Sequence, residues 1–209
     1  MTSGTKAYNQ LPLLEQRATS RLDNHLAALG EIFVKHGVHG DFALAVPHRH
    51  CALDEGQVMV HETFDDSIVE CRPRQMNEQL VPYSYHVLHG HIYPYEFHRG
   101  SFALGLPHAF VQETCHAARQ WGLDGYIGIC RKGSLPPGAM QIESELLGMQ
   151  GTRTEVLPRD EWEQRFDGCR FQITAWYFVE EKDGEVTVNC LKGCRADAFG
   201  KHDVTAPRD

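Results

Sequence analysis

The segment that most constrains the fold is a long hairpin near the C-terminal end of the chain. Residues 171–181 (FQITAWYFVEE) and 185–191 (EVTVNCL) are rich in β-branched and aromatic side chains, and the tripeptide KDG separates them. Asp183-Gly184 is a residue pair that readily adopts the positive φ angles of a tight hairpin turn. The sequence therefore predicts two antiparallel strands here.

Shorter elements precede this hairpin. Apolar residues recur at helical spacing in the N-terminal part, which predicts an amphipathic helix over residues 12–36. Further helices are expected at 111–123 and 159–166. Segments with strand-like patterns are residues 41–51, 57–64, 67–73, 83–93 and 126–130. These elements predict an α+β fold, in which the N-terminal helix packs on a mainly antiparallel sheet or small barrel.

Length and composition limit the organisation and the partners. The 209 residues predict a single domain, 1–209, with flexible ends at 1–10 and 200–209. A formal charge of −8 and the absence of a dense Lys/Arg run argue against nucleic acid as a partner. The first ten residues lack the features of a secretory signal, and the apolar run ITAWYFV is too short to span a membrane. With seven scattered cysteines, this predicts a cytoplasmic protein with reduced thiols.

Histidine is the unusual residue, because ten of the thirteen histidines lie between His36 and His108. The stretch AVPHRHCALDEGQVMVHE, residues 45–62, predicts a hairpin. His48 and His50 share one face of its first strand. If Asp54 and Glu55 form the turn, His61 lies opposite His48, and three imidazoles converge at a distance that suits one metal ion. A loop one residue longer or shorter would move His61 to the other face.

A motif in this hairpin resembles a known family. His48-x-His50-x4-Glu55 resembles the first metal-binding motif of the cupin superfamily, and GLPHAF at 105–110 looks like the stretch that carries the fourth cupin ligand. The resemblance covers residues 40–110 and implies a small cupin-like β-barrel. It also implies Glu55 and His108 as further ligands or supporting residues. Cupins bind Fe, Mn, Ni, Zn or Cu, often for dioxygenase or isomerase chemistry. The pattern after His108 is helical, where a cupin continues with a strand.

A second histidine cluster occupies residues 83–98. One face of the predicted strand carries His89, His91, Tyr85 and Tyr93 together with other aromatic residues. Either the two histidines are metal ligands, or the four side chains form the wall of a cavity and act as acid–base or orienting groups. We favour the second interpretation. His86 and His98 fall on the opposite face, where surface or supporting roles are expected.

The cysteines give weaker signals. Cys190 and Cys194 stand close together after the last predicted strand, but a zinc knuckle would need further ligands. Buried thiols without a function are the simpler expectation for both residues.

These observations lead to three hypotheses. The first is a small-molecule enzyme with a mononuclear transition-metal ion (Fe, Cu, Zn, Mn or Ni), an oxidoreductase such as an oxygenase, an isomerase or a lyase. The second is a metal-free cyclase or isomerase that uses His and Tyr residues on an apolar metabolite. The third is a non-catalytic module that binds a metal or another ligand. The expected partner is a small-molecule substrate, and a homodimer is a possible assembly.

Overall fold

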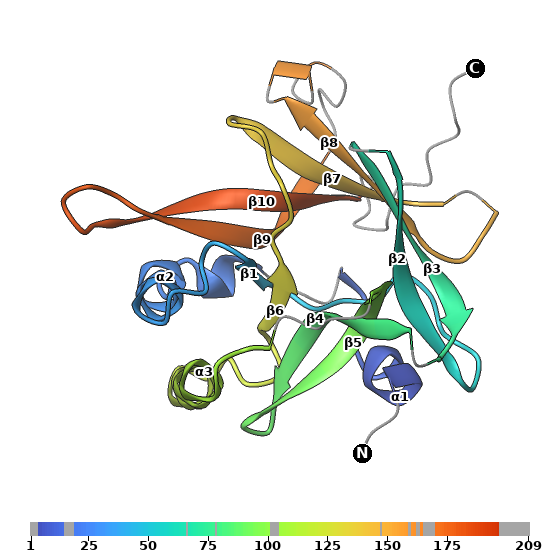
Figure 1. The fold of residues 1–209 in the computed structure, drawn as a ribbon, viewed down its shortest axis with the longest axis horizontal. Coiled ribbons are helices and arrows are strands. Elements are labelled where there is room, and N and C mark those ends of the chain that lie inside the picture. Colours follow the sequence, from blue (N-terminus) through green and yellow to red (C-terminus); the bar gives the residue numbers. More distant parts are fainter. Residues whose placement is uncertain are drawn as a thin grey trace.

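The structure is a computed structural model, and it describes residues 4–14, 19–65, 67–77, 79–100, 105–146, 148–158, 160–161, 164 and 170–196. Its strands form one closed barrel in the order β1-β6-β4-β5-β2-β3-β8-β7-β10-β9 (Figure 1). The strands are β1 Phe42–Ala45, β2 Gln57–Asp65, β3 Ile68–Gln75, β4 Leu80–Leu88, β5 His91–Arg99, β6 Gly128–Arg131, β7 Ala139–Glu145, β8 Thr152–Pro158, β9 Arg170–Glu180 and β10 Val186–Ala196.

Most neighbouring strands in the barrel are antiparallel. Two pairs are parallel, β2 with β5 and β7 with β10. The mainly antiparallel character agrees with the prediction, and the α+β class fits broadly. The sheet, however, is a closed barrel that accounts for most of the regular structure, with few helices around it.

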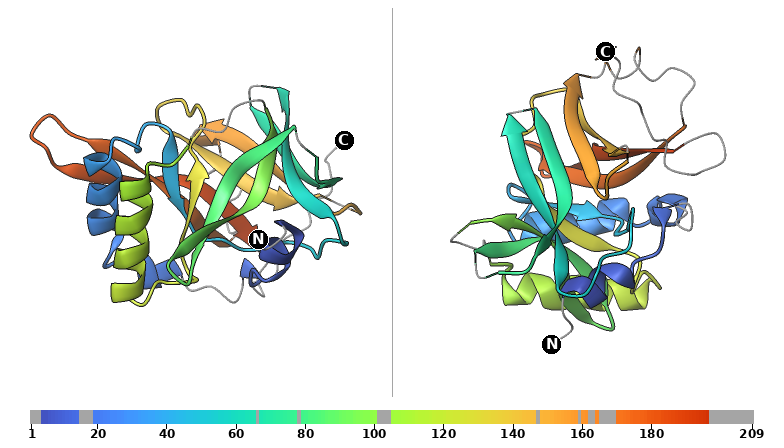
Figure 2. Two further views of the ribbon diagram at one scale, coloured as in Figure 1. Left: turned by 60° about the horizontal axis from the view of Figure 1, so that its bottom comes forward. Right: turned by 90° about the vertical axis from the view of Figure 1, so that its right-hand side faces the viewer.

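Helices α2 (Leu26–Lys35) and α3 (His108–Gln120) lie side by side against one flank of the barrel (Figures 1 and 2). Phe33 joins them to the sheet, because its ring centroid lies 4.9 Å from that of Phe110 and 5.0 Å from that of Phe178. Gly30 permits this close packing, since a Cβ there would lie 2.6 Å from the Phe178 ring. No helix in the described part of the chain is long and apolar enough to cross a membrane.

The N-terminal region differs from the prediction. The helix expected over 12–36 is wrong as a continuous element, because the described residues of this range contain only η2 (Thr19–Leu22) and α2 as named elements. Leu14 and Leu22 are nevertheless buried. The apolar spacing therefore identified residues that are buried, although these residues do not belong to one continuous helix. Residues 4–9, expected to be flexible, form helix α1 (Gly4–Asn9). Residues 200–209 lie outside the described residues.

Two hairpins can be compared with the predictions. The C-terminal hairpin is confirmed, since β9 and β10 pair along their length and the turn contains Gly184 with φ +85°. The single strand predicted over 83–93 is wrong. It is a hairpin of β4 and β5 that turns at His89-Gly90, where φ is 53° and 75°. Positive φ at both residues is the geometry of a tight type I′ turn.

The histidine hairpin predicted over 45–62 is also wrong. β1 ends at Ala45 and pairs with β6 and β9, whereas β2 begins at Gln57 and pairs with β3 and β5. The connection between these strands is therefore not a tight turn. The register that would place His61 opposite His48 does not exist.

Candidate metal centre

Four side chains converge in the barrel: His48, His50, Glu143 and Cys194. One potential ligand atom from each lies within 4.8 Å of all the others. Glu143 Oε2 lies 3.6 Å from His48 Nε2 and 3.4 Å from His50 Nε2. These distances exceed the usual range of about 2.7–3.2 Å for a direct hydrogen bond. They match the roughly 3.3–3.6 Å expected between two ligands of a tetrahedral metal ion with bonds of about 2.0–2.2 Å.

The N-terminal segment holds the two imidazoles in place. Arg49 lies between them, and its backbone N–H donates to Pro12 O at 2.9 Å. The Arg49 side chain donates from Nε to Leu11 O, also at 2.9 Å. The backbone N–H of His50 donates to the Tyr8 hydroxyl at 3.3 Å. Because the chain is anchored at Arg49, both of its neighbours reach the same carboxylate.

Strand pairing supplies the other two side chains. Glu143 on β7 and Cys194 on β10 are direct partners in the parallel pair. On β7, Met140 and Ile142 pack into an apolar cluster with Leu157. Because successive side chains point to opposite faces of a strand, Glu143 lies on the other face.

Neighbouring groups orient these potential ligands. His48 Nδ1 must donate to Val46 O at 2.9 Å, because a carbonyl only accepts, and Nε2 is then the nitrogen that faces Glu143. The second oxygen of Glu143, Oε1, accepts from Thr152 Oγ1 at 3.3 Å and lies 3.5 Å from Lys192 Nζ. Supporting hydrogen bonds of this kind are characteristic of metal ligands.

The electrostatic environment stabilises positive charge at the imidazoles. Burial lowers the pKa of His48, but interactions with Cys194 and Glu143 outweigh it and raise the pKa to about 9. The pKa of His50 is raised for the same reasons. Burial raises the pKa of Glu143, yet Lys192 and the two histidines hold that pKa well below its ordinary value. Imidazole binds a metal ion in its neutral form, so a metal held by Glu143 and the two histidines would displace these protons.

A second group contains His61, Cys71 and Glu96, whose potential ligand atoms also lie within 4.8 Å of one another. His61 is therefore brought to Cys71 and Glu96 rather than to His48 and His50. Burial raises the pKa of the Cys71 thiol well above its ordinary value, and the nearby Glu96 and Glu143 raise it further.

The structure does not bring the two remaining predicted ligands to either group. Glu55 is exposed in the turn before β2. His108 is exposed at the first residue of α3. The GLPHAF stretch therefore leads into a helix on the outside of the barrel.

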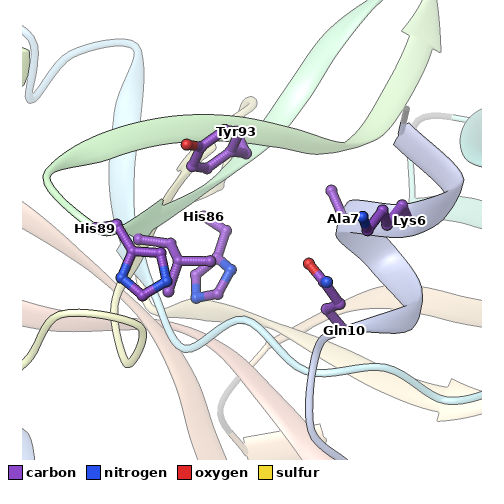
Figure 3. Close-up of a pocket in the computed structure, with 7 residues that line it drawn as sticks. Lys6, Ala7, Gln10, His86, His89 and Tyr93 are labelled. Carbon is purple, nitrogen blue, oxygen red and sulfur yellow. The ribbon is translucent and has the colours of Figure 1, made fainter. Parts of the chain in front are cut away.

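The four residues predicted as catalytic are spread over different surroundings. Tyr85 packs in the apolar core near α2 and α3, and His91 is exposed. His89 and Tyr93 line a pocket of about 230 Å³ between α1 and the β4–β5 hairpin (Figure 3). The other residues that line this pocket are Lys6, Ala7, Gln10, His86 and Leu88.

The turn at His89-Gly90 explains why the predicted face failed, because it pairs His86 with Tyr93 and Tyr85 with Pro94. In the β4–β5 pair, Ser84 is opposite Glu96, while Pro82 pairs with Phe97 and Tyr85 with Pro94. Tyr83 and Tyr95 are therefore extra residues without a direct partner, and each shifts the alternation of its strand. Directly paired residues share a face, so His86, expected on the opposite face from Tyr93, lies in the pocket with it, while Tyr85 packs in the helix-covered core.

Sequence reasoning did not identify Glu143 and identified Cys194 only as one of two weak candidates. The stretch MQIESE, residues 140–145, alternates apolar and polar side chains, which is the signal of a half-buried strand. That signal could have revealed β7 and the face that carries Glu143. Cys190, by contrast, is exposed.

Comparison with known proteins adds no further assignment. No protein-family model, curated protein or solved structure matches the chain. The closed barrel and the His/Glu/Cys cluster within it are therefore the features that indicate a function.

Proposed function

We propose that this protein is a metal-dependent enzyme acting on a small molecule, with its cation held by His48, His50, Glu143 and Cys194. The main support for this proposal is the position of the Glu143 carboxylate. Its Oε2 lies at ligand-to-ligand distances from both imidazoles, while its Oε1 accepts a hydrogen bond from Thr152 and lies near Lys192. Nitrogen and sulfur donors together favour Zn, Fe, Cu or Ni over Mn.

The bound metal would supply a Lewis acid or a redox centre, which suits oxygenase, isomerase and lyase chemistry alike. The chain's own residues would position the substrate. Helix α1 and the residue after it contact both the pocket and the metal cluster. Lys6 and Gln10 line the pocket, and the Tyr8 hydroxyl accepts a hydrogen bond from the His50 backbone N–H. A pocket of about 230 Å³ is smaller than those that hold drug-sized ligands, so a small metabolite is the expected substrate.

A cupin-like centre is compatible with this arrangement. The closed barrel and the two histidines of the H-x-H motif agree with the resemblance. In our proposal, however, the carboxylate is Glu143 rather than Glu55, and Cys194 takes the place suggested for His108. The likeness to cupins would then be limited to the barrel architecture and to the first two metal ligands, His48 and His50.

The pocket itself favours a second candidate function. His86, His89 and Tyr93 line this pocket, and none of the residues that line it belongs to the metal cluster. Imidazole and phenol groups facing a cavity can transfer protons, so a metal-free cyclase or isomerase remains the alternative.

A metabolite screen on three preparations separates these functions. They are the metal-loaded protein, the metal-stripped protein and a metal-treated His48→Ala/His50→Ala variant. The proposal predicts turnover only by the first. Turnover that survives metal removal would instead support acid–base catalysis in the pocket. A metal-loaded protein that converts nothing would indicate a binding module. The matched control is His108→Ala/His116→Ala, which removes two exposed histidines and should keep the activity of the metal-loaded protein.

A further inference from the structure

We propose that the barrel holds a second, separate transition-metal site formed by His61, Cys71 and Glu96. The three residues come from β2, β3 and β5, whereas the first cluster uses β7, β10 and the segment after β1. The two groups share no side chain. This site goes beyond the proposed function and does not depend on it.

Strand pairing brings the three donors together. His61 on β2 and Cys71 on β3 are direct partners in an antiparallel pair. Directly opposed residues have Cβ atoms about 4.5–5.5 Å apart, which is close enough for their side chains to share a ligand. β5 runs parallel to β2 on its other side, and Glu96 is paired with Met59, two residues before His61. The Glu96 carboxylate then reaches the imidazole, with Oε2 3.2 Å from His61 Nε2.

Neighbouring side chains fix the orientation of two of these donors. Ser84 Oγ donates to Glu96 Oε2 at 2.7 Å. The Tyr83 ring stacks on the His61 ring, with centroids 4.0 Å apart and planes inclined by 27°. Both contacts come from the bulged part of β4, where Tyr83 is the extra residue. Bulges that redirect side chains are common beside functional sites, and such supporting contacts are typical of metal ligands.

Lys192 places one positive charge near the carboxylates of both proposed sites. Its ammonium lies 3.5 Å from Glu143 Oε1 and also interacts electrostatically with Glu96. This positive charge opposes a cation at either carboxylate, and it opposes two cations bridged by one carboxylate most strongly. The arrangement therefore indicates two mononuclear sites. The second has three protein donors, which leaves a coordination position for a further ligand, as in catalytic zinc sites.

The donor set also defines which metal fits. One thiolate, one imidazole and one carboxylate form a mixed set that suits Zn²⁺ or Co²⁺ rather than Mg²⁺ or Ca²⁺. Co²⁺ is the useful probe, because a bound thiolate gives it a charge-transfer band in the near ultraviolet. That band reports directly on cysteine coordination.

Co²⁺ titration of the metal-stripped protein tests the proposal. We use Cys194→Ser as the background, so that any thiolate band must come from another cysteine. The proposal predicts that a band develops as Co²⁺ is added and that Cys71→Ser, introduced into this background, abolishes it. His61→Ala and the isosteric Glu96→Gln should each weaken Co²⁺ binding at this site at least tenfold. Far-ultraviolet circular dichroism confirms that each variant is folded.

The outcomes distinguish this site from the first one. A His48→Ala/His50→Ala variant that still shows the Cys71-dependent band would support the second site even if the first were wrong. If no band develops in the Cys194→Ser background, the His61–Glu96 contact is only a buried hydrogen bond and the proposal fails. A band that persists in both Cys71→Ser and His61→Ala would assign the metal to other residues and would also overturn it.

Discussion

The ammonium of Lys192 lies 3.5 Å from Glu143 Oε1, and both side chains are largely buried, with exposed fractions of 16% and 5%. Burial lowers the pKa of Lys192, but Glu143 and Glu96 outweigh it and hold that pKa above its ordinary value, so the amine is charged. In the metal-free protein this cation balances carboxylates that would otherwise repel each other.

Replacement of this cation should therefore destabilise the fold. Removing one partner of a buried ion pair typically costs about 3–5 kcal/mol. We expect Lys192→Met to lower the free energy of unfolding of the metal-free protein by this amount, as measured by urea denaturation. Excess Zn²⁺ should recover part of the loss, because a bound cation replaces the missing charge.

Lys35→Met is the matched control for this prediction. Lys35 also pairs with a carboxylate, that of Glu113, but its side chain is 63% exposed. Exposed ion pairs contribute about 0–1 kcal/mol to the free energy of unfolding. The Lys35→Met variant should therefore have nearly the stability of the wild type, with or without Zn²⁺. Equal losses in the two variants would contradict the account of Lys192.

Gly128 should be needed to position His48. A Cβ at Gly128 would lie 2.4 Å from Tyr85 O and 2.6 Å from Pro47 Cγ, and Pro47 directly precedes His48. We expect Gly128→Ala to cost about 1–3 kcal/mol and to weaken Zn²⁺ binding, because Pro47 must move. Isothermal titration calorimetry measures the affinity.

Gly40→Ala provides the comparison, because no atom lies within 4 Å of a Cβ built there. This variant should retain the wild-type stability to within about 0.5 kcal/mol, together with its metal affinity. If Gly128→Ala bound Zn²⁺ as tightly as Gly40→Ala, the role of this glycine in positioning the ligand would be wrong.

His89 occupies a strained turn position. Its φ is 53°, its side chain is 80% exposed, and Asn-Gly is a preferred pair for this turn type. We expect His89→Asn to raise the free energy of unfolding by about 0.5–1 kcal/mol, since Asn tolerates this conformation better. If the pocket binds the substrate, the same variant should turn over less substrate, as measured by steady-state kinetics. A variant that is less stable than the wild type would contradict the strain argument.

Asn9 should link helix α1 to the segment that carries the histidines. Its side chain donates to Leu53 O at 2.9 Å and accepts from Leu53 N–H at 2.8 Å. Loss of both bonds in Asn9→Ala should cost about 1–3 kcal/mol and weaken Zn²⁺ binding several-fold. The exposed Asn24→Ala variant should show neither effect. Unchanged metal affinity in Asn9→Ala would show that α1 does not hold the site.

The sequence predicted local elements better than their arrangement. The β9–β10 hairpin was predictable because its strands alternate and Asp183-Gly184 encodes the turn. The barrel order was not, since β1 pairs with strands more than 80 residues away in sequence, as in the Ala43–Cys130 pair. Such pairings depend on packing of the whole chain, and no local pattern specifies them.

The candidate site shows the same limit. His48 and His50 were predictable as a pair because two residues on an extended chain share a face. Their partners were not, because Glu143 and Cys194 lie 93 and 144 positions beyond His50 and meet only through the β7–β10 pairing. The assumed tight turn at Asp54-Glu55 failed because contacts with the N-terminal segment hold Arg49 and Leu53 instead.

The metal content of the purified chain tests the central claim most directly. Protein purified without an affinity His-tag is analysed by inductively coupled plasma mass spectrometry, beside the His48→Ala/His50→Ala variant. The account predicts at least one transition-metal ion per wild-type chain, and one fewer in a variant that still gives the circular dichroism spectrum of the wild type. Equal metal content in the two proteins, or none in a wild type supplied with Zn²⁺, Fe²⁺, Cu²⁺ and Ni²⁺, would contradict it.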